Sequence, residues 1–222
     1  MIKPQALLFD LDGTLVDSRG DIAAACNAAL AAHGRPTLPL GSILPMVGDG
    51  ARMLIMRALA AVEVPGEPLL EEVVATFRDY YLAHPCVLTT MLPGAREILD
   101  EARLDGLSCA LVTNKPRDVT LALLQALGLE STFAAVWGGG DGPLKPAPNG
   151  VLSALTRLGV AAADAWMIGD GPQDIDAGRA AGCFTVGIPG IAERERLFAS
   201  APDIIYESLD ELRAELAQLT RA

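Results

Sequence analysis

The chain has 222 residues, of which 51% are apolar, and its formal net charge at pH 7 is −11. This apolar content can fill the core of one α/β domain carrying a smaller insertion, and it excludes an intrinsically disordered chain. The negative charge argues against general nucleic-acid binding, which needs clustered Lys and Arg side chains facing the phosphates.

Five short apolar runs are bounded by turn residues, and each run is continuous rather than alternating. Continuous runs are typical of strands that are buried on both faces of a parallel sheet. The runs span residues 6–9, 109–112, 133–137, 165–168 and 184–188. Helical patterns lie between or after them, at 95–107, 119–129, 150–158, 174–181 and 208–219. This alternation predicts an α/β fold with a Rossmann-like, doubly wound parallel sheet.

The segment from residue 17 to residue 85 breaks this alternation. It contains no convincing strand, and its helical patterns at 22–32, 51–62 and 69–82 are separated by turns rich in Gly and Pro. We therefore expect a helical domain over 17–85, inserted into a core domain formed by 1–16 and 86–222.

Polar residues follow three of the predicted strands, at the point where each strand ends. The three runs are Asp10-Leu11-Asp12-Gly13-Thr14, Thr113-Asn114-Lys115 and Gly169-Asp170-Gly171-Pro172-Gln173-Asp174. In open α/β sheets, ligands bind outside the carboxyl ends of the strands, where the strand order reverses. We therefore expect these three runs to meet in one place.

Four carboxylates in one cleft repel each other unless a cation or shifted pKa values relieve the repulsion. A hard divalent cation is the simplest relief, and Mg²⁺ fits because it is held by carboxylates together with waters and a substrate phosphate. Lys145, which lies between Leu144 and Pro146, adds a fixed positive charge suited to phosphoryl oxygens. The sequence therefore predicts a site for Mg²⁺ and a phosphorylated ligand.

Each of these residues also has a simpler structural interpretation. Asp10 and Asp12 could form an Asx turn after a strand, and Asp170 and Asp174 could cap the N-terminus of a helix. Lys145 could be a solvated surface lysine. The occurrence of all four groups in one order favours the catalytic interpretation.

The order and spacing of these groups resemble those of haloacid-dehalogenase-superfamily phosphatases over essentially the whole chain. The run from Asp10 to Thr14 resembles the first motif of that family, and Thr113 and Lys145 resemble the second and third. Gly169-Asp170 together with Asp174 resembles the fourth. The helical insertion at 17–85 resembles the α-helical cap of the family.

The resemblance implies a role for each group. Asp10 would be the nucleophile that forms an aspartyl-phosphate, and Asp12 would act first as general acid and then as general base. Mg²⁺ would be held by Asp10, Asp170 and the main-chain carbonyl of Asp12, with support from Asp174. Thr113, Asn114 and Lys145 would bind the transferring phosphoryl group, and Leu11 and Asp12 would also bind substrate. Of these, Thr113 and Lys145 also count as catalytic.

Two features separate phosphate ester hydrolysis from other reactions of the family. Members that remove halogen from carbon lack the second carboxylate, which is present here as Asp12. Phosphonate hydrolases of the family use a lysine in the cap to form a Schiff base, and residues 17–85 contain no lysine. Both observations favour a phosphatase.

The segment from Val47 to Leu54, preceded by His33-Gly-Arg-Pro36, resembles the cap of phosphoglycolate phosphatases. Gly48 and Gly50 would let the main chain approach a ligand closely, next to a helix N-terminus that favours an anion. Arg52 would then meet a substrate carboxylate, although an arginine on a helix is often simply solvated.

We therefore expect a small phosphorylated metabolite as substrate, with 2-phosphoglycolate favoured. The alternatives are a sugar or nucleotide phosphate, the reaction of a β-phosphoglucomutase-like phosphomutase, and, in another class, a catalytically inert binding scaffold. The sequence also predicts a cytoplasmic protein with no membrane partner, because the first apolar run ends at Asp10 and no run approaches the length of a membrane span. We expect a monomer or homodimer. The four cysteines form no Cys-x-x-Cys pair, so we expect reduced thiols.

Overall fold

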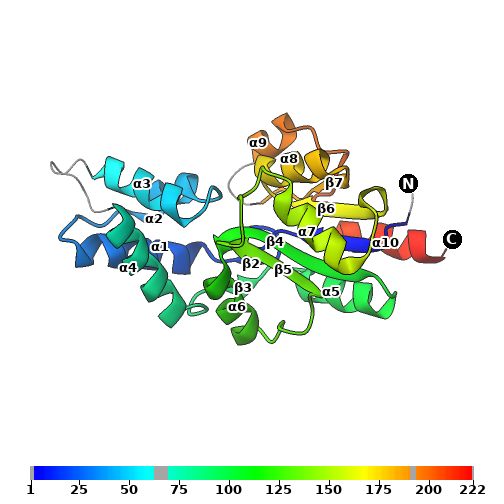
Figure 1. The fold of residues 1–222 in the computed structure, drawn as a ribbon, viewed down its shortest axis with the longest axis horizontal. Coiled ribbons are helices and arrows are strands. Elements are labelled where there is room, and N and C mark those ends of the chain that lie inside the picture. Colours follow the sequence, from blue (N-terminus) through cyan, green and yellow to red (C-terminus); the bar gives the residue numbers. More distant parts are fainter. Residues whose placement is uncertain (1–2, 63–69, 191–193, 222) are drawn as a thin grey trace.

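A six-stranded sheet forms the centre of the core, in a computed structural model that describes residues 3–62, 70–190 and 194–221. The strand order is β5-β4-β1-β6-β7-β8, and neighbouring strands are parallel throughout. The order reverses at β1, which lies between β4 and β6 (Figure 1). The strands are β1 (Ala6–Phe9), β4 (Ser108–Pro116), β5 (Ala135–Gly139), β6 (Ala165–Gly169), β7 (Phe184–Gly187) and β8 (Ile204–Ile205).

Strand β1 shows why the apolar runs are continuous. All four of its side chains are fully buried, but they point alternately to two different clusters. Leu7 and Phe9 belong to the cluster on one face of the sheet, and Ala6 and Leu8 belong to the cluster on the other. Because helices cover both faces, each position of the strand favours an apolar side chain.

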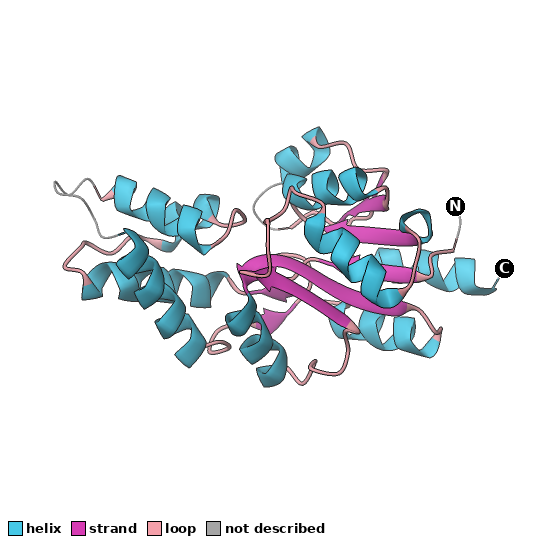
Figure 2. Cartoon of the chain, in the orientation of Figure 1, coloured by secondary structure: helices cyan, strands magenta, loops and turns pink. Residues whose placement is uncertain are grey.

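The helices of the core divide between these two faces (Figure 2). Side chains of α5, α6 and α10 fill the cluster that contains Leu7, and those of α7 and α8 fill the cluster that contains Leu8. The helical elements of the core after β3 are α5 (Ala95–Leu104), α6 (Arg117–Ala126), α7 (Asn149–Leu158), η2 (Ala162–Asp164), α8 (Pro172–Ala181), α9 (Arg194–Ala199) and α10 (Leu209–Arg221). The predicted α/β fold with a doubly wound parallel sheet is confirmed.

The insertion leaves the core through a short antiparallel pair. Strand β2 (Val16–Asp17) pairs with β3 (Thr90–Met91), and the chain between them forms a lobe beside the sheet (Figure 1). We call this lobe the cap and keep 17–85 as its proposed domain boundaries. Its elements are α1 (Arg19–Ala32), α2 (Leu40–Ile43), η1 (Leu44–Met46), α3 (Ala51–Ala61) and α4 (Leu70–Ala83).

The cap has an apolar cluster of its own, built from side chains of α1, α3 and α4. Val119, which belongs to α6 of the core, is fully buried in the same cluster. The cap is therefore packed against the core along α6. The start of the helix predicted at 69–82 and the segment 63–69 before α4 lie outside the described residues.

Several predicted boundaries differ from the observed ones. The strand predicted at 133–137 is β5 and begins at Ala135, while Phe133 packs into the core from the preceding loop. Strand β4 runs beyond the predicted end at 112, because its pairing with β5 resumes at Pro116 after a register shift. This irregular stretch carries Thr113, Asn114 and Lys115. The short strands β2, β3 and β8 and the helix α9 were not predicted.

Two further features bear on the sequence-based expectations. Within the described ranges, no helix combines the length and apolar character needed to cross a bilayer. The four cysteines are unpaired thiols, and three of them are buried.

Candidate active site

A cavity of about 270 Å³ lies between the cap and the carboxyl ends of β1, β4 and β6. Its core side is polar and is lined by Asp10, Asp12, Thr113, Asn114, Lys115, Lys145 and Asp170. Its cap side is largely apolar and is lined by Arg19, Ile22, Leu44, Val47, Gly48, Gly50, Leu54, Phe77 and Tyr81. The topology therefore brings the predicted polar runs to one place, as expected at the point where strand order reverses.

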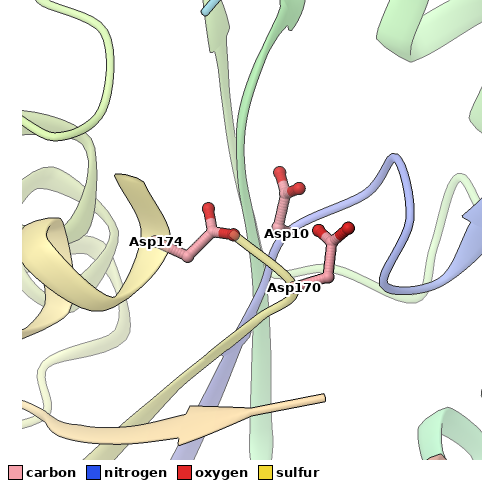
Figure 3. A group of neighbouring side chains, drawn as sticks. All are labelled: Asp10, Asp170 and Asp174. Atoms are coloured by element: carbon pink, nitrogen blue, oxygen red, sulfur yellow. The ribbon is translucent and has the colours of Figure 1, made fainter. Parts of the chain in front are cut away.

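Three carboxylates converge at the core side of this cavity (Figure 3). Asp10 follows β1, Asp170 follows β6, and Asp174 lies in the first turn of α8. Each offers an oxygen, and these oxygens lie within 4.8 Å of one another. The side chain of Asp12 points elsewhere and does not belong to this group.

Lys145 is the cation nearest to this cluster, and its side chain is only 3% exposed. Its ammonium donates hydrogen bonds to Asp10 Oδ1 and to the carbonyl oxygen of Val112, both at 2.6 Å. It also lies 2.6 Å from Asp174 Oδ1, in an ion pair. Lys145 is therefore buried between two carboxylates, and the alternative of a solvated surface lysine is wrong.

Asp174 combines a structural contact with a position in the cluster. Its Oδ2 accepts a hydrogen bond from the Gly171 amide at 3.0 Å, which caps helix α8. Its Oδ1 is buried and lies 2.6 Å from the ammonium of Lys145, in an ion pair. A carboxylate oxygen has more than one lone pair, so this atom can contact a second cation as well.

Burial and mutual repulsion disturb the ionisation of the cluster. Burial raises the pKa of Asp10 to about 7, with the charges of Asp174 and Asp12 adding to the effect and Lys145 opposing it. Burial also raises the pKa of Asp170 well above its usual value, and the neighbouring Asp174 and Asp10 charges reinforce this. One lysine therefore does not neutralise three carboxylates. The donor set consists of hard oxygens, which fits a divalent cation such as Mg²⁺.

The backbone around Asp170 has room only for glycine at two positions. A Cβ atom at Gly13, where φ is +89°, would collide with the Asp170 carboxylate, and so would a Cβ atom at Gly190. Thr14 Oγ1 donates a hydrogen bond to Asp170 Oδ1 at 3.3 Å. The loop after β1 thus encloses the carboxylate that follows β6.

Asp12 is held by a separate set of contacts. Its Oδ1 accepts hydrogen bonds from Ser18 Oγ at 2.5 Å and from Lys115 Nζ at 2.8 Å. Lys115 Nζ also donates to the hydroxyl of Tyr81 at 2.5 Å. Sequence reasoning assigned no role to Lys115 or Tyr81, although Lys115 directly follows two predicted site residues at the end of the same strand.

The remaining core residues of the prediction are placed as follows. Thr113 is buried, lines the cavity, and accepts a hydrogen bond from the Lys115 amide at 3.2 Å. The Asn114 amide nitrogen donates to the carbonyl oxygens of Gly48 and Lys145, at 2.9 and 3.0 Å. Asn114 therefore ties the Lys145 loop to the cap. The side chain of Leu11 is fully buried in the core cluster, which leaves its backbone as the part that could meet a ligand.

The cap residues of the prediction divide into two groups. Gly48 and Gly50 line the cavity, with positive φ angles of +114° and +86° that favour glycine. Arg52, by contrast, is exposed, pairs with Glu71 at 2.8 Å, and is not part of the cavity lining. The arginine of the cap that does line the cavity is Arg19.

The sequence model of the haloacid dehalogenase-like hydrolase family matches residues 7–188 of this chain. The chain belongs to this family. A phosphoglycolate phosphatase from Pseudomonas putida is 36% identical over 219 residues, which cover 96% of this chain and 79% of the relative. A phosphoglycolate phosphatase from Vibrio parahaemolyticus is 36% identical over 212 residues, which cover 93% of each chain.

A solved structure shows the same likeness in three dimensions. The structure of a predicted phosphoglycolate phosphatase from Haemophilus somnus superposes with a TM-score of 0.89 at 28% identity. The superposition covers 97% of this chain and 99% of the other. The family predicted from the four motifs is thereby confirmed.

Proposed function

We propose that this family member is a Mg²⁺-dependent phosphomonoesterase that hydrolyses a small phosphorylated metabolite through an aspartyl-phosphate on Asp10. The observation that carries the proposal is the convergence of Asp10, Asp170 and Lys145 at one cavity, with an oxygen of the buried Asp174 within 4.8 Å of oxygens of the other two carboxylates. Phosphoryl transfer depends mainly on positioning and on charge stabilisation, and this set supplies both. The names of the relatives described above support the same class of reaction.

The proposed reaction has two steps. In the first, an oxygen of Asp10 bonds to phosphorus while the ester bond breaks, and Asp12 gives its proton to the leaving oxygen. In the second, Asp12 takes a proton from water as that water attacks phosphorus, which releases inorganic phosphate and restores Asp10. Lys145 and Thr113 would bind the oxygens of the transferring group.

The metal would be held by Asp10, Asp170 and the main-chain carbonyl of Asp12, with Asp174 in support. When bound, it supplies positive charge that offsets the charge of the phosphoryl oxygens. This role agrees with the excess of carboxylates over lysines at the core side of the cavity.

For the substrate we propose 2-phosphoglycolate, which would be converted to glycolate and phosphate. The relatives at 36% identity carry that activity in their names, and a cavity of about 270 Å³ suits a small ester. A substrate carboxylate needs a cation, and Lys115 and Lys145 are already bound to Asp12 and Asp10. Among the described cavity residues the other cation is Arg19, which pairs with Asp17 at 2.6 Å but is 33% exposed, whereas both lysines are buried, so we propose Arg19 for the contact predicted for Arg52.

A panel of phosphate esters tests the proposal. Phosphate release would be ranked by kcat/KM for 2-phosphoglycolate, 2-hydroxyethyl phosphate, sugar phosphates and nucleotides, with and without Mg²⁺. We expect 2-phosphoglycolate to rank first and 2-hydroxyethyl phosphate, which has the same length but no carboxylate, to rank at least about 10-fold lower.

The outcomes separate the alternatives. A sugar or nucleotide phosphate at the head of the ranking would overturn the substrate but keep the reaction class. Phosphate release without a bisphosphate activator counts against a phosphomutase. Activity that persists without Mg²⁺ and in the Asp10→Asn variant would contradict the mechanism, and no release from any ester would favour the inert scaffold.

A further inference from the structure

Lys115 is a buried cation that has no role in the proposed chemistry. Its side chain is 2% exposed and lies at the end of β4, apart from the three converging carboxylates. Its ammonium contacts Asp12 Oδ1 at 2.8 Å and the Tyr81 hydroxyl at 2.5 Å. Burying an ammonium is costly, and both acceptors offset part of that cost.

The two acceptors stabilise the charged form of this lysine. Burial alone would lower the pKa of Lys115, but the negative charge of Asp12 and the contact with Tyr81 outweigh it and raise that pKa. Burial raises the pKa of Tyr81 to about 12, so its phenol is neutral. The pair therefore consists of a lysine cation and a neutral hydroxyl acceptor.

Tyr81 belongs to the cap, whereas Lys115 and Asp12 belong to the core. Tyr81 lies on α4, is fully buried, and packs edge-on against Phe77 with a ring-centroid distance of 5.7 Å. The position of its hydroxyl is therefore set by the packing of the cap. The three residues form a chain of contacts from the interior of the cap to Asp12.

Separate contacts dock α4 and the Gly48 loop on the core. Arg78 pairs with Asp118 of α6 at 2.7 Å, and Asn114 donates to the carbonyl of Gly48 at 2.9 Å. Val119 of α6 is buried among cap side chains. Tyr81 therefore reaches Lys115 in an arrangement in which the cap is docked, and an undocked cap would leave the ammonium without one of its two acceptors.

We propose that Lys115 is a positioning residue for Asp12 and that Tyr81 links it to the cap, so that Asp12 is oriented for proton transfer when α4 is docked. This inference rests on the proposed function, because it assumes that Asp12 moves the protons of the reaction. Its consequence is that proton transfer is coupled to the closure that excludes water from the cavity.

The leaving group of the ester provides a direct readout of this role. An alkoxide needs a proton from Asp12, whereas p-nitrophenolate is a stable anion and leaves without one. Hydrolysis of the aspartyl-phosphate needs Asp12 as a base whichever ester formed it. A misplaced Asp12 should therefore slow the first step only for alkyl esters and the second step for all esters.

The test uses two variants of the full-length protein. Tyr81→Phe removes only the hydroxyl, and Lys115→Met removes the charge but keeps the length of the side chain. With the best alkyl phosphate of the panel, we expect kcat to fall about 10-fold in Tyr81→Phe and about 100-fold in Lys115→Met. With p-nitrophenyl phosphate, rapid mixing should show a burst of p-nitrophenol that is nearly as fast as in the wild type, followed by a slow steady rate.

Asp79→Asn serves as the matched control, because Asp79 lies two residues before Tyr81 on the same helix, is exposed, and takes no part in the docking contacts described above. We expect it to change the rates with both esters by the same factor, within about 2-fold. Thermal unfolding of each variant shows whether it is folded, and Tyr81→Phe keeps the test decisive if Lys115→Met does not fold.

Equal losses with alkyl and aryl esters and no burst would overturn the inference and leave Lys115 with a purely structural role. Unchanged rates in both variants would overturn it as well. A wild-type protein that hydrolyses no ester would remove the proposed function and this inference together. If the wild type is active and the variants give either of the two overturning results above, only the inference is removed and the proposed function stands.

Discussion

The two sides of the cavity are built from opposite chemistry. The core side presents carboxylates and lysines at the ends of β1, β4 and β6, whereas the cap side presents mainly apolar side chains such as Ile22, Leu54 and Phe77. The core side is held by ion pairs of 2.6 Å, and the cap side is held by packing in its own cluster. This difference suggests that bond making belongs to the core and that substrate choice and exclusion of water belong to the cap.

The largest expected effect is the loss of activity when the nucleophile on the core side is replaced. Asp10→Asn keeps the shape of the side chain but removes the nucleophile, so we expect kcat to fall by at least about 10⁴-fold. Phosphate release in the presence of Mg²⁺ measures this loss. Asp176→Asn, in the exposed ion pair with Arg179 on α8, is the control and should keep wild-type activity. A residual activity above one hundredth would remove Asp10 from the mechanism.

The next largest effect is expected at the junction between core and cap, where a substitution should lower the stability of the protein. Asp21 is buried on α1 and accepts hydrogen bonds from the amides of Val87, Leu88 and Thr89 on the returning chain. Asp21→Ala leaves these amides without their acceptor, so we expect the free energy of unfolding to fall by about 2–4 kcal/mol. Urea unfolding measures it, with the exposed Asp79→Ala as control. A change in the free energy of unfolding below about 0.5 kcal/mol would show that the junction does not depend on this carboxylate.

Metal binding should stabilise the core side of the cavity and leave the cap side unchanged. At about 100 times its Kd, Mg²⁺ would stabilise the wild type by about 2.7 kcal/mol, which corresponds to a Tm increase of about 5–10 °C. Asp170→Asn should lose this increase. In chelator it should be more stable than the wild type by about 2–4 °C, because it removes a buried like charge. Calorimetry checks both signs, and an equal response to Mg²⁺ in the two proteins would contradict the site.

The smallest expected effect concerns the cap side and substrate choice. Arg19 lines the cavity and pairs with Asp17, whereas Arg52 is exposed and pairs with Glu71. Arg19→Ala should raise the KM for 2-phosphoglycolate about 10-fold and leave that for 2-hydroxyethyl phosphate unchanged, while Arg52→Ala changes neither. Steady-state kinetics with the two esters measure this difference. The reverse result would support the sequence-based hypothesis for Arg52.

Much of the fold follows from local patterns. The continuous apolar run at 6–9 predicts a strand covered on both faces, and β1 is one, with Leu7 and Leu8 in different clusters. The alternation of apolar runs and helical patterns predicted the doubly wound sheet, and the order of polar runs after the strands predicted the family; both are confirmed. These features depend on the chemical type and spacing of neighbouring residues, which a sequence displays directly.

Local patterns therefore suffice to place these residues at the ends of the strands and to predict that they converge. The tertiary structure alone decided which partner each long side chain meets: Lys115 contacts Asp12 across 103 residues and Tyr81 across 34. It likewise turned Arg52 toward Glu71 and Arg19 toward the cavity. The physical reason is that such partners depend on how the cap packs on the core, and this packing sums many weak contacts between segments far apart in the chain.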